Sequence, residues 1–111
     1  MPVDYFYIKQ GDTVPAIEVL LKDAYGAPVN VTGATIVFSM RVKPAGTVKV
    51  NGATAAIVTA GLGRVRYAWV AANTDTADEY EGEFQVTFSN GAIQTFPNDS
   101  HITVVVTDDV S

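Results

Sequence analysis

The densest group of potentially reactive side chains lies between Asn73 and Phe84, in the segment NTDTADEYEGEF. Five carboxylates stand within these twelve residues, namely Asp75, Asp78, Glu79, Glu81 and Glu83. Paired carboxylates serve enzymes as general acids and bases, and clustered carboxylates bind calcium. If this protein performs catalysis or binds a metal, we expect this segment to take part.

Glu81 and Glu83 alternate with the apolar residues of the segment YEGEFQVTF, which runs from Tyr80 to Phe88. Successive side chains of a strand point to opposite faces, so the two glutamates share one face, about 7 Å apart. Glycosidases place their two carboxylates about 5–9.5 Å apart, but the general acid of such a pair needs a pKa raised by burial. Because both glutamates lie opposite the apolar row, the pattern favours a solvated strand face over a catalytic pair.

Asp75 and Asp78 are the candidates for a metal site. A calcium loop carries acidic residues at alternating positions, a glycine at the sixth and a bidentate glutamate at the twelfth, and DTAD does not follow this order. A looser calcium site that uses backbone carbonyls remains the alternative. The sequence favours a short helical turn capped by Asn73 or Thr74, followed by a strand. Tyr80 then stands where immunoglobulin-like sandwiches place a tyrosine whose hydroxyl bonds to upstream backbone.

The remaining candidates for chemistry lack partners. His101 is the only histidine, and no serine elbow or second catalytic motif accompanies it. Arg41, Arg64 and Arg66 lie on the polar faces of expected strands, either as a small basic patch or paired with glutamates across the sheet. We therefore expect no catalytic residues and no cofactor, which means that the protein is not an enzyme.

The composition of the 111-residue chain is that of a folded, mildly acidic protein, with 48% hydrophobic and 17% charged residues. The absence of cysteine excludes disulfides and thiolate zinc sites. A net charge of −5 disfavours a general nucleic-acid binder. The start, MPVDYFYIKQ, shows no secretory signal, and no apolar stretch is long enough to span a membrane. We expect one soluble domain, residues 1–111.

Turn sequences recur every eight to twelve residues, and the apolar residues between them alternate with period two. One of these turns is Asn51–Gly52, a pair typical of a tight two-residue hairpin. No segment longer than a single turn has helical periodicity. The pattern predicts an all-β fold, an immunoglobulin-like antiparallel β-sandwich of about eight to nine strands.

The alternation also assigns side chains to the core and to the surface. The aromatic residues expected in one core cluster between two sheets are Phe38, Tyr67, Trp69, Tyr80 and Phe84. Near the N-terminus, Tyr5 and Tyr7 project from one side of the first strand, and Phe6 and Ile8 project from the other. A strand that is apolar on both faces suggests that its outward side meets a partner, so Tyr5 and Tyr7 are the candidate partner-binding residues.

Several motifs occur together over most of the chain: KQGDTVP opening the second strand, D-x-x-G-x-P-V-x-V-T-G-A-T leading to the third, Y-x-W before the Asp-Thr corner, and EFQVTFSNG followed by TFP. In this combination the segments Phe6 to Met40 and Gly63 to Asp99 resemble the N-terminal domain family of phage baseplate upper proteins. That family consists of immunoglobulin-like β-sandwich domains of tailed-phage virions. The resemblance implies a structural or adaptor protein of the particle, and it supplies no catalytic residue.

The leading hypothesis is a virion protein of the tail or baseplate that acts by protein–protein docking. Its partners would be other virion proteins, it would be present in many copies, and it would be made in the host cytoplasm. A capsid decoration protein is an alternative within the same setting. A carbohydrate-binding module that attaches particles to host glycans is the alternative from a different class.

Overall fold

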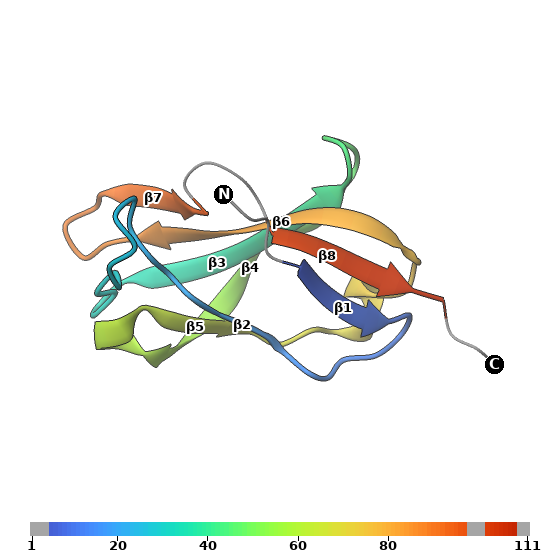
Figure 1. The fold of residues 1–111 in the computed structure, drawn as a ribbon, viewed down its shortest axis with the longest axis horizontal. Coiled ribbons are helices and arrows are strands. Elements are labelled where there is room, and N and C mark those ends of the chain that lie inside the picture. The colour runs from blue at the N-terminus through green and yellow to red at the C-terminus, as the bar shows by residue number, and fades with distance from the viewer. Residues whose placement is uncertain (1–4, 98–101, 109–111) are drawn as a thin grey trace.

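The computed structural model describes residues 5–97 and 102–108. Figure 1 shows a fold built of strands joined by turns and loops. The eight strands of the described residues are β1 (Tyr5–Lys9), β2 (Ile17–Leu20), β3 (Thr35–Val42), β4 (Val48–Thr59), β5 (Arg64–Tyr67), β6 (Asp78–Thr87), β7 (Ile93–Phe96) and β8 (Ile102–Thr107). Two single 3-10 turns, η1 (Ala60–Leu62) and η2 (Ala71–Asn73), follow β4 and β5.

The strands form one sheet that folds over on itself, in the order β1-β8-β6-β3-β4-β5-β2, with β7 paired to β6. The first part of β4 pairs with β3, and its last residues pair with β5, so this long strand passes from one layer to the other. The predicted all-β class is confirmed, and the two layers fit an immunoglobulin-like sandwich. One detail differs from an antiparallel arrangement, because β1 runs parallel to β8.

The core lies between the two layers and is centred on aromatic rings. The five aromatic residues expected there, Phe38, Tyr67, Trp69, Tyr80 and Phe84, are all at most 5% exposed. The ring centroid of Phe38 lies 4.9 Å from that of Tyr67, 5.0 Å from that of Phe84 and 5.5 Å from that of Trp69. Such pairs stabilise a core beyond the area that they bury.

A glycine in β6 makes room for the central ring. Gly82 lies on the inner face of the strand, and a Cβ atom at this position would stand 3.1 Å from Cζ of Phe38 and 3.4 Å from Cγ2 of Val104. Both distances are at or below ordinary van der Waals contact. Gly82 therefore interrupts the apolar row of β6 so that the Phe38 ring can occupy the space between the layers.

The prediction of a hairpin at Asn51–Gly52 is wrong. Both residues lie inside β4, where the pairing with β3 shifts register. Gly52 has a φ of 65° and its N–H donates to the Ser39 hydroxyl at 2.8 Å. The chain reverses instead between β3 and β4, where the N–H of Gly46 donates to the carbonyl of Val42 at 2.6 Å. The positive φ that favours glycine here serves a bulge in a long strand and not a turn.

Candidate functional site

The acidic segment begins at the turn η2, which is held by the side chain of Asn73. Its amide oxygen accepts the Tyr67 hydroxyl at 2.7 Å and the backbone N–H of Val70 at 3.0 Å. Asn73 is the last residue of the turn, so the expectation that Asn73 or Thr74 caps its start is wrong. The turn lies three residues earlier because the amide side chain bonds backward to Val70, as short polar side chains do in tight turns.

The corner between η2 and β6 is tied to its surroundings by two hydroxyl groups. Thr74 is fully buried, and its hydroxyl donates to the carbonyl of Asp12 at 2.8 Å. The hydroxyl of Tyr80 donates to the carbonyl of Thr76 at 2.7 Å. The second bond is the one that the tyrosine-corner interpretation predicts. The residues that lead from η2 to β6 thus have an architectural role.

Asp75 and Asp78 take part in separate interactions. The carboxylate of Asp75 pairs with the ammonium group of Lys49 and accepts the Thr76 hydroxyl at 3.0 Å. The hydrogen bond from Lys49 holds the pKa of Asp75 below its ordinary value. The carboxylate of Asp78 accepts the N–H of Glu79 at 2.7 Å. Within residues 5–97 and 102–108, no three acidic or histidine side chains come together in a group that could hold a metal ion.

Glu81 and Glu83 share the outer face of β6, as predicted, but their surroundings differ. Glu83 is exposed, whereas the side chain of Glu81 is only 13% exposed. One carboxylate oxygen of Glu81 accepts from the Arg41 guanidinium at 2.7 Å and from the N–H of Ala45 at 3.1 Å. The expected solvated position is therefore wrong for Glu81, which is covered by the turn between β3 and β4.

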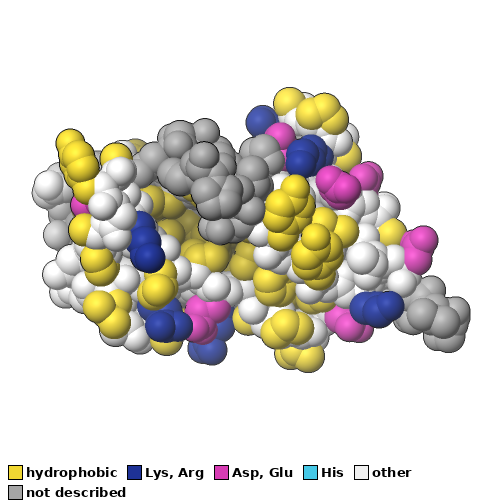
Figure 2. Space-filling view, viewed as in Figure 1, with side chains coloured by type: hydrophobic (Ala, Val, Ile, Leu, Met, Phe, Trp, Pro, Cys, Tyr) yellow, Lys and Arg dark blue, Asp and Glu magenta, His cyan; other side chains and the backbone are white. Residues whose placement is uncertain are grey.

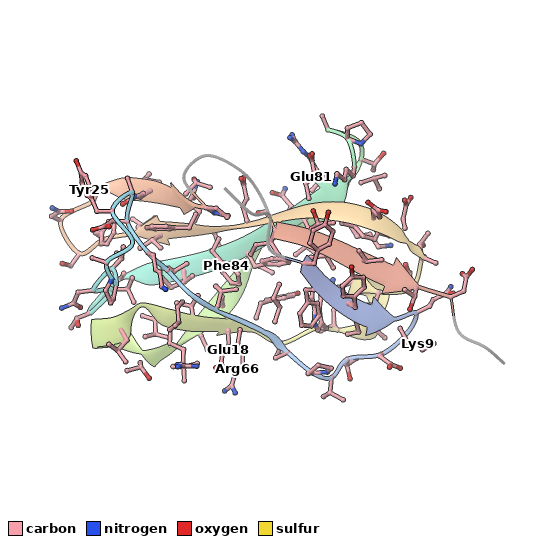
Figure 3. The ribbon with its side chains drawn as sticks, viewed as in Figure 1. Lys9, Glu18, Tyr25, Arg66, Glu81 and Phe84 are labelled. Atoms are coloured by element: carbon pink, nitrogen blue, oxygen red, sulfur yellow. The ribbon has the colours of Figure 1, made fainter. Side chains whose placement is uncertain are left out.

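A shallow hollow of about 360 Å³ lies on this outer face, and its lining includes Ser39, Asn51, Glu81 and Glu83. Figure 3 shows Glu81 pointing away from the core, which is marked by Phe84 on the same strand. The hollow combines carboxylate, hydroxyl, amide and guanidinium groups with two apolar side chains, without a histidine or a nucleophile held by a base. These polar groups can donate and accept hydrogen bonds, and they do not form a catalytic arrangement.

The three arginines do not form a basic patch. Arg41 pairs with Glu81 on the outer face of one layer, whereas Arg64 and Arg66 lie 2.9 Å and 4.0 Å from the carboxylate of Glu18 in the other layer. Figure 3 shows Glu81 on one side of the molecule and Glu18 with Arg66 on the opposite side. The arrangement is the cross-strand pairing that the sequence offered as the alternative, and such surface pairs contribute little to stability.

Tyr5 and Tyr7 lie side by side on the outward face of β1. They are 57% and 64% exposed, and their rings are 6.1 Å apart with an angle of 12° between the planes. Phe6 points inward, with its ring centroid 5.8 Å from that of Trp69, and Ile8 is buried. Figure 2 shows hydrophobic side chains exposed over the β1 and β8 region of this face. A strand with apolar side chains on both faces is thus present as predicted.

The sequence patterns did not predict some features of the surface. The pair of Lys49 and Asp75 joins residues 26 positions apart, and no local spacing marks it. Tyr25 is 95% exposed at the tip of the loop between β2 and β3, where the turn sequence DAYGAP predicts a loop and assigns no role to the ring. His101 lies outside the described residues.

Comparisons with known proteins add no family: no protein-family model matches the chain, and no curated protein matches it. In the described part of the chain, no helix has the length and apolar character needed to cross a membrane.

Proposed function

We propose that this protein is a structural or adaptor protein of a tailed-phage virion, located in the tail or baseplate, and that it acts by docking to other proteins of the particle. The sequence resemblance over most of the chain supports the setting. The observation that carries the docking role is the pair of exposed tyrosines on β1, Tyr5 and Tyr7. Tyrosine is enriched at interfaces because it buries a large area and keeps a polar group.

The location of this surface supports docking over catalysis. β1 ends the sheet order, so its outward face and its open edge belong to the same strand. A partner that covers Tyr5 and Tyr7 therefore also reaches unpaired backbone groups, which is how strand addition joins proteins. The carboxylates at the corner, by contrast, are engaged in internal ion pairs and hydrogen bonds.

The test is to measure the protein content of purified particles. Quantitative mass spectrometry of virions from the phage that encodes this chain should find it in many copies. Antibody labelling of intact virions, imaged by electron microscopy, should place it on the tail or baseplate. Labelling on capsid faces would favour a decoration protein. Absence of the chain from purified particles would overturn the proposal.

A second candidate function is favoured by one observation, the nearly parallel rings of Tyr5 and Tyr7, which are 6.1 Å apart and exposed. Exposed aromatic rings can stack on sugar rings, so a carbohydrate-binding module for host attachment would use this same surface. Titration with host glycans, followed by the fluorescence of the tyrosines, separates the two functions. A saturable change that is lost in Tyr5→Ser would support the glycan role.

A further inference from the structure

Three strands of the described residues pair with a single neighbouring strand, and their open edges are not protected equally. β1 and β2 end the sheet order, and β7 pairs with β6 alone. Natural sheets protect open edges with prolines, charges and short strands. β2 has four residues and carries Glu18, and β7 has four residues followed directly by Pro97. β1 has five residues, and its only charge is Lys9 at the end.

The backbone of β1 presents the same residues to its open edge that carry the exposed side chains. The N–H of Gln10 donates to the carbonyl of Thr107 in β8 at 2.8 Å. The N–H and C=O groups of one strand residue point to the same neighbouring strand, and every second residue points the same way. The backbone groups of Phe6 and Ile8 therefore also face β8. Tyr5, Tyr7 and Lys9 therefore face the open side, where the carbonyl of Lys9 also accepts the N–H of Asp12 at 3.0 Å. Within the described residues no other strand pairs with that side.

We propose that the open edge of β1 binds the β1 strand of a second copy of this chain, antiparallel, about a two-fold axis at Tyr7. In this register Tyr7 lies opposite its own copy, and the two exchange N–H to carbonyl bonds across the axis. The proposal rests on the proposed function, because it names the partner of the same docking surface. A two-fold contact of this kind is the commonest way in which identical chains associate.

The side chains of β1 are complementary to themselves in this register. Tyr5 lies opposite Lys9 of the second copy, which places an ammonium group beside an exposed ring, and Lys9 makes no ion pair within the described part of its own chain. Phe6 lies opposite Ile8 of the second copy, both on the core side. The pair of two tyrosines at the axis, the pair of tyrosine and lysine, and the pair of two apolar side chains are all favourable. This complementarity argues for a second copy and not for an unrelated strand.

The contact is small, since five residues of each copy cannot cover the area of about 1,200–2,000 Å² that is typical of a stable complex. We therefore expect a weak dimer that is populated at high protein concentration or when many copies are held close together. Crowding of many copies is the situation that the proposed virion role supplies.

The test is sedimentation equilibrium of the purified chain up to about 1 mM, a concentration at which weak complexes become populated. The weight-average mass should rise from 11.8 kDa toward twice that value. Tyr7→Lys, which places two like charges at the axis, should keep the mass at that of the monomer. Tyr25→Lys is the matched control, because Tyr25 is an exposed tyrosine at the opposite end of the molecule from Lys9, and it should associate as the unchanged protein does (Figure 3).

Hydrogen exchange on the unchanged protein gives a second readout that needs no variant. Exchange of the Tyr7 amide should slow severalfold as concentration rises, while the Phe6 amide, which faces β8, should not change. A mass that stays at 11.8 kDa, or equal association of Tyr7→Lys and Tyr25→Lys, would overturn the proposal. A protein that is monomeric in solution but present in virions would contradict the dimer and leave the proposed function in place. A protein that forms the dimer but is absent from virions would contradict the proposed function and leave the dimer in place.

Discussion

The hydroxyl groups of Tyr67 and Tyr80 are the polar ends of two side chains that are otherwise inside the core. Each donates to an oxygen of the η2 corner, Tyr67 to the Asn73 side chain and Tyr80 to the carbonyl of Thr76. Burial raises the pKa of both phenols above the ordinary value of 10.0. The folded state therefore favours the neutral phenol at these two positions.

Stability should accordingly fall at alkaline pH. Because the folded pKa values are raised, the stabilisation is fully present below pH 10.0 and is lost as the pH rises through the folded values. Urea denaturation between about pH 8 and pH 11 measures this dependence. The control is the double variant Tyr67→Phe with Tyr80→Phe, which should show a smaller decline. An equal decline in the variant would contradict the assignment to these phenols.

Gly82→Ala should destabilise the protein by about 1–3 kcal/mol, because the added methyl group overpacks the core. Its Cβ would lie 3.1 Å from the Phe38 ring. The matched control is Gly61→Ala, since a Cβ at Gly61 meets no atom within 4 Å and its φ is not positive. Urea midpoints compare the two variants. A Gly82→Ala protein as stable as the control would mean that the Phe38 ring moves aside at no cost.

At the scale of elements, the alternation of apolar residues predicted correctly the strands that stay in one layer. It did not predict the strand that passes from one layer to the other. The inward rows of β3, β5 and β6 follow the apolar pattern, and the alternation of β5 continues past its end to Trp69, which is why the five core aromatics could be named from the sequence. The long strand β4 could not be predicted, because its Asn51–Gly52 pair has the same local preference in a hairpin as in a bulge. In the bulge the N–H of Gly52 donates to the Ser39 hydroxyl of the neighbouring strand, a contact that no local pattern marks.

Long-range contacts limit the prediction of the candidate sites in the same way. The corner tyrosine could be identified because its hydroxyl bonds only four residues upstream. The position of Glu81 depends on the N–H of Ala45, which lies 36 residues away, so no pattern near Glu81 indicates that it is covered. The parallel pairing of β1 with β8 likewise joins the two ends of the described chain.

Two glycines with nearly equal φ angles allow the cost of backbone strain to be compared with the cost of steric overlap. Gly52 has a φ of 65° with open space around it. Gly63 has a φ of 67°, and a methyl group added there would lie 2.5 Å and 2.8 Å from the carbonyl oxygens of Val29 and Leu21. Gly52→Ala should cost about 1–2 kcal/mol, the strain of the left-handed conformation. Gly63→Ala should cost about 1–3 kcal/mol more, because the turn after η1 must open. Equal urea midpoints for the two variants would contradict this account.

At the scale of the whole molecule, the fold is held by one continuous core, and the acidic corner is satisfied by Lys49 and by hydrogen bonds. We therefore expect no metal-dependent stability. EDTA should leave the melting temperature unchanged, and millimolar calcium should raise it by no more than about 1–2 °C. A larger rise that disappears in Asp75→Asn would show a calcium site that uses this carboxylate.

The whole molecule exposes its aromatic pair on a strand that ends the sheet, next to backbone groups that no described strand covers. The account therefore makes β1 the part of the protein through which it joins an assembly. The core contacts of this strand come from Phe6 and Ile8, on its other face. The outward tyrosines can thus be changed without removing core packing.

The most direct measurement compares the amount of this protein in purified virions when Tyr5 and Tyr7 are both replaced by serine and when Tyr25 is replaced by serine. All three tyrosines are exposed, and only the first two lie on β1. Both variants should have the circular dichroism and urea midpoint of the unchanged protein. We expect at least tenfold depletion of the Tyr5→Ser and Tyr7→Ser double variant from the particles, a loss of about 1.4 kcal/mol or more in docking, and normal incorporation of Tyr25→Ser. Incorporation of the double variant at the normal level would contradict the claim that β1 is the docking surface.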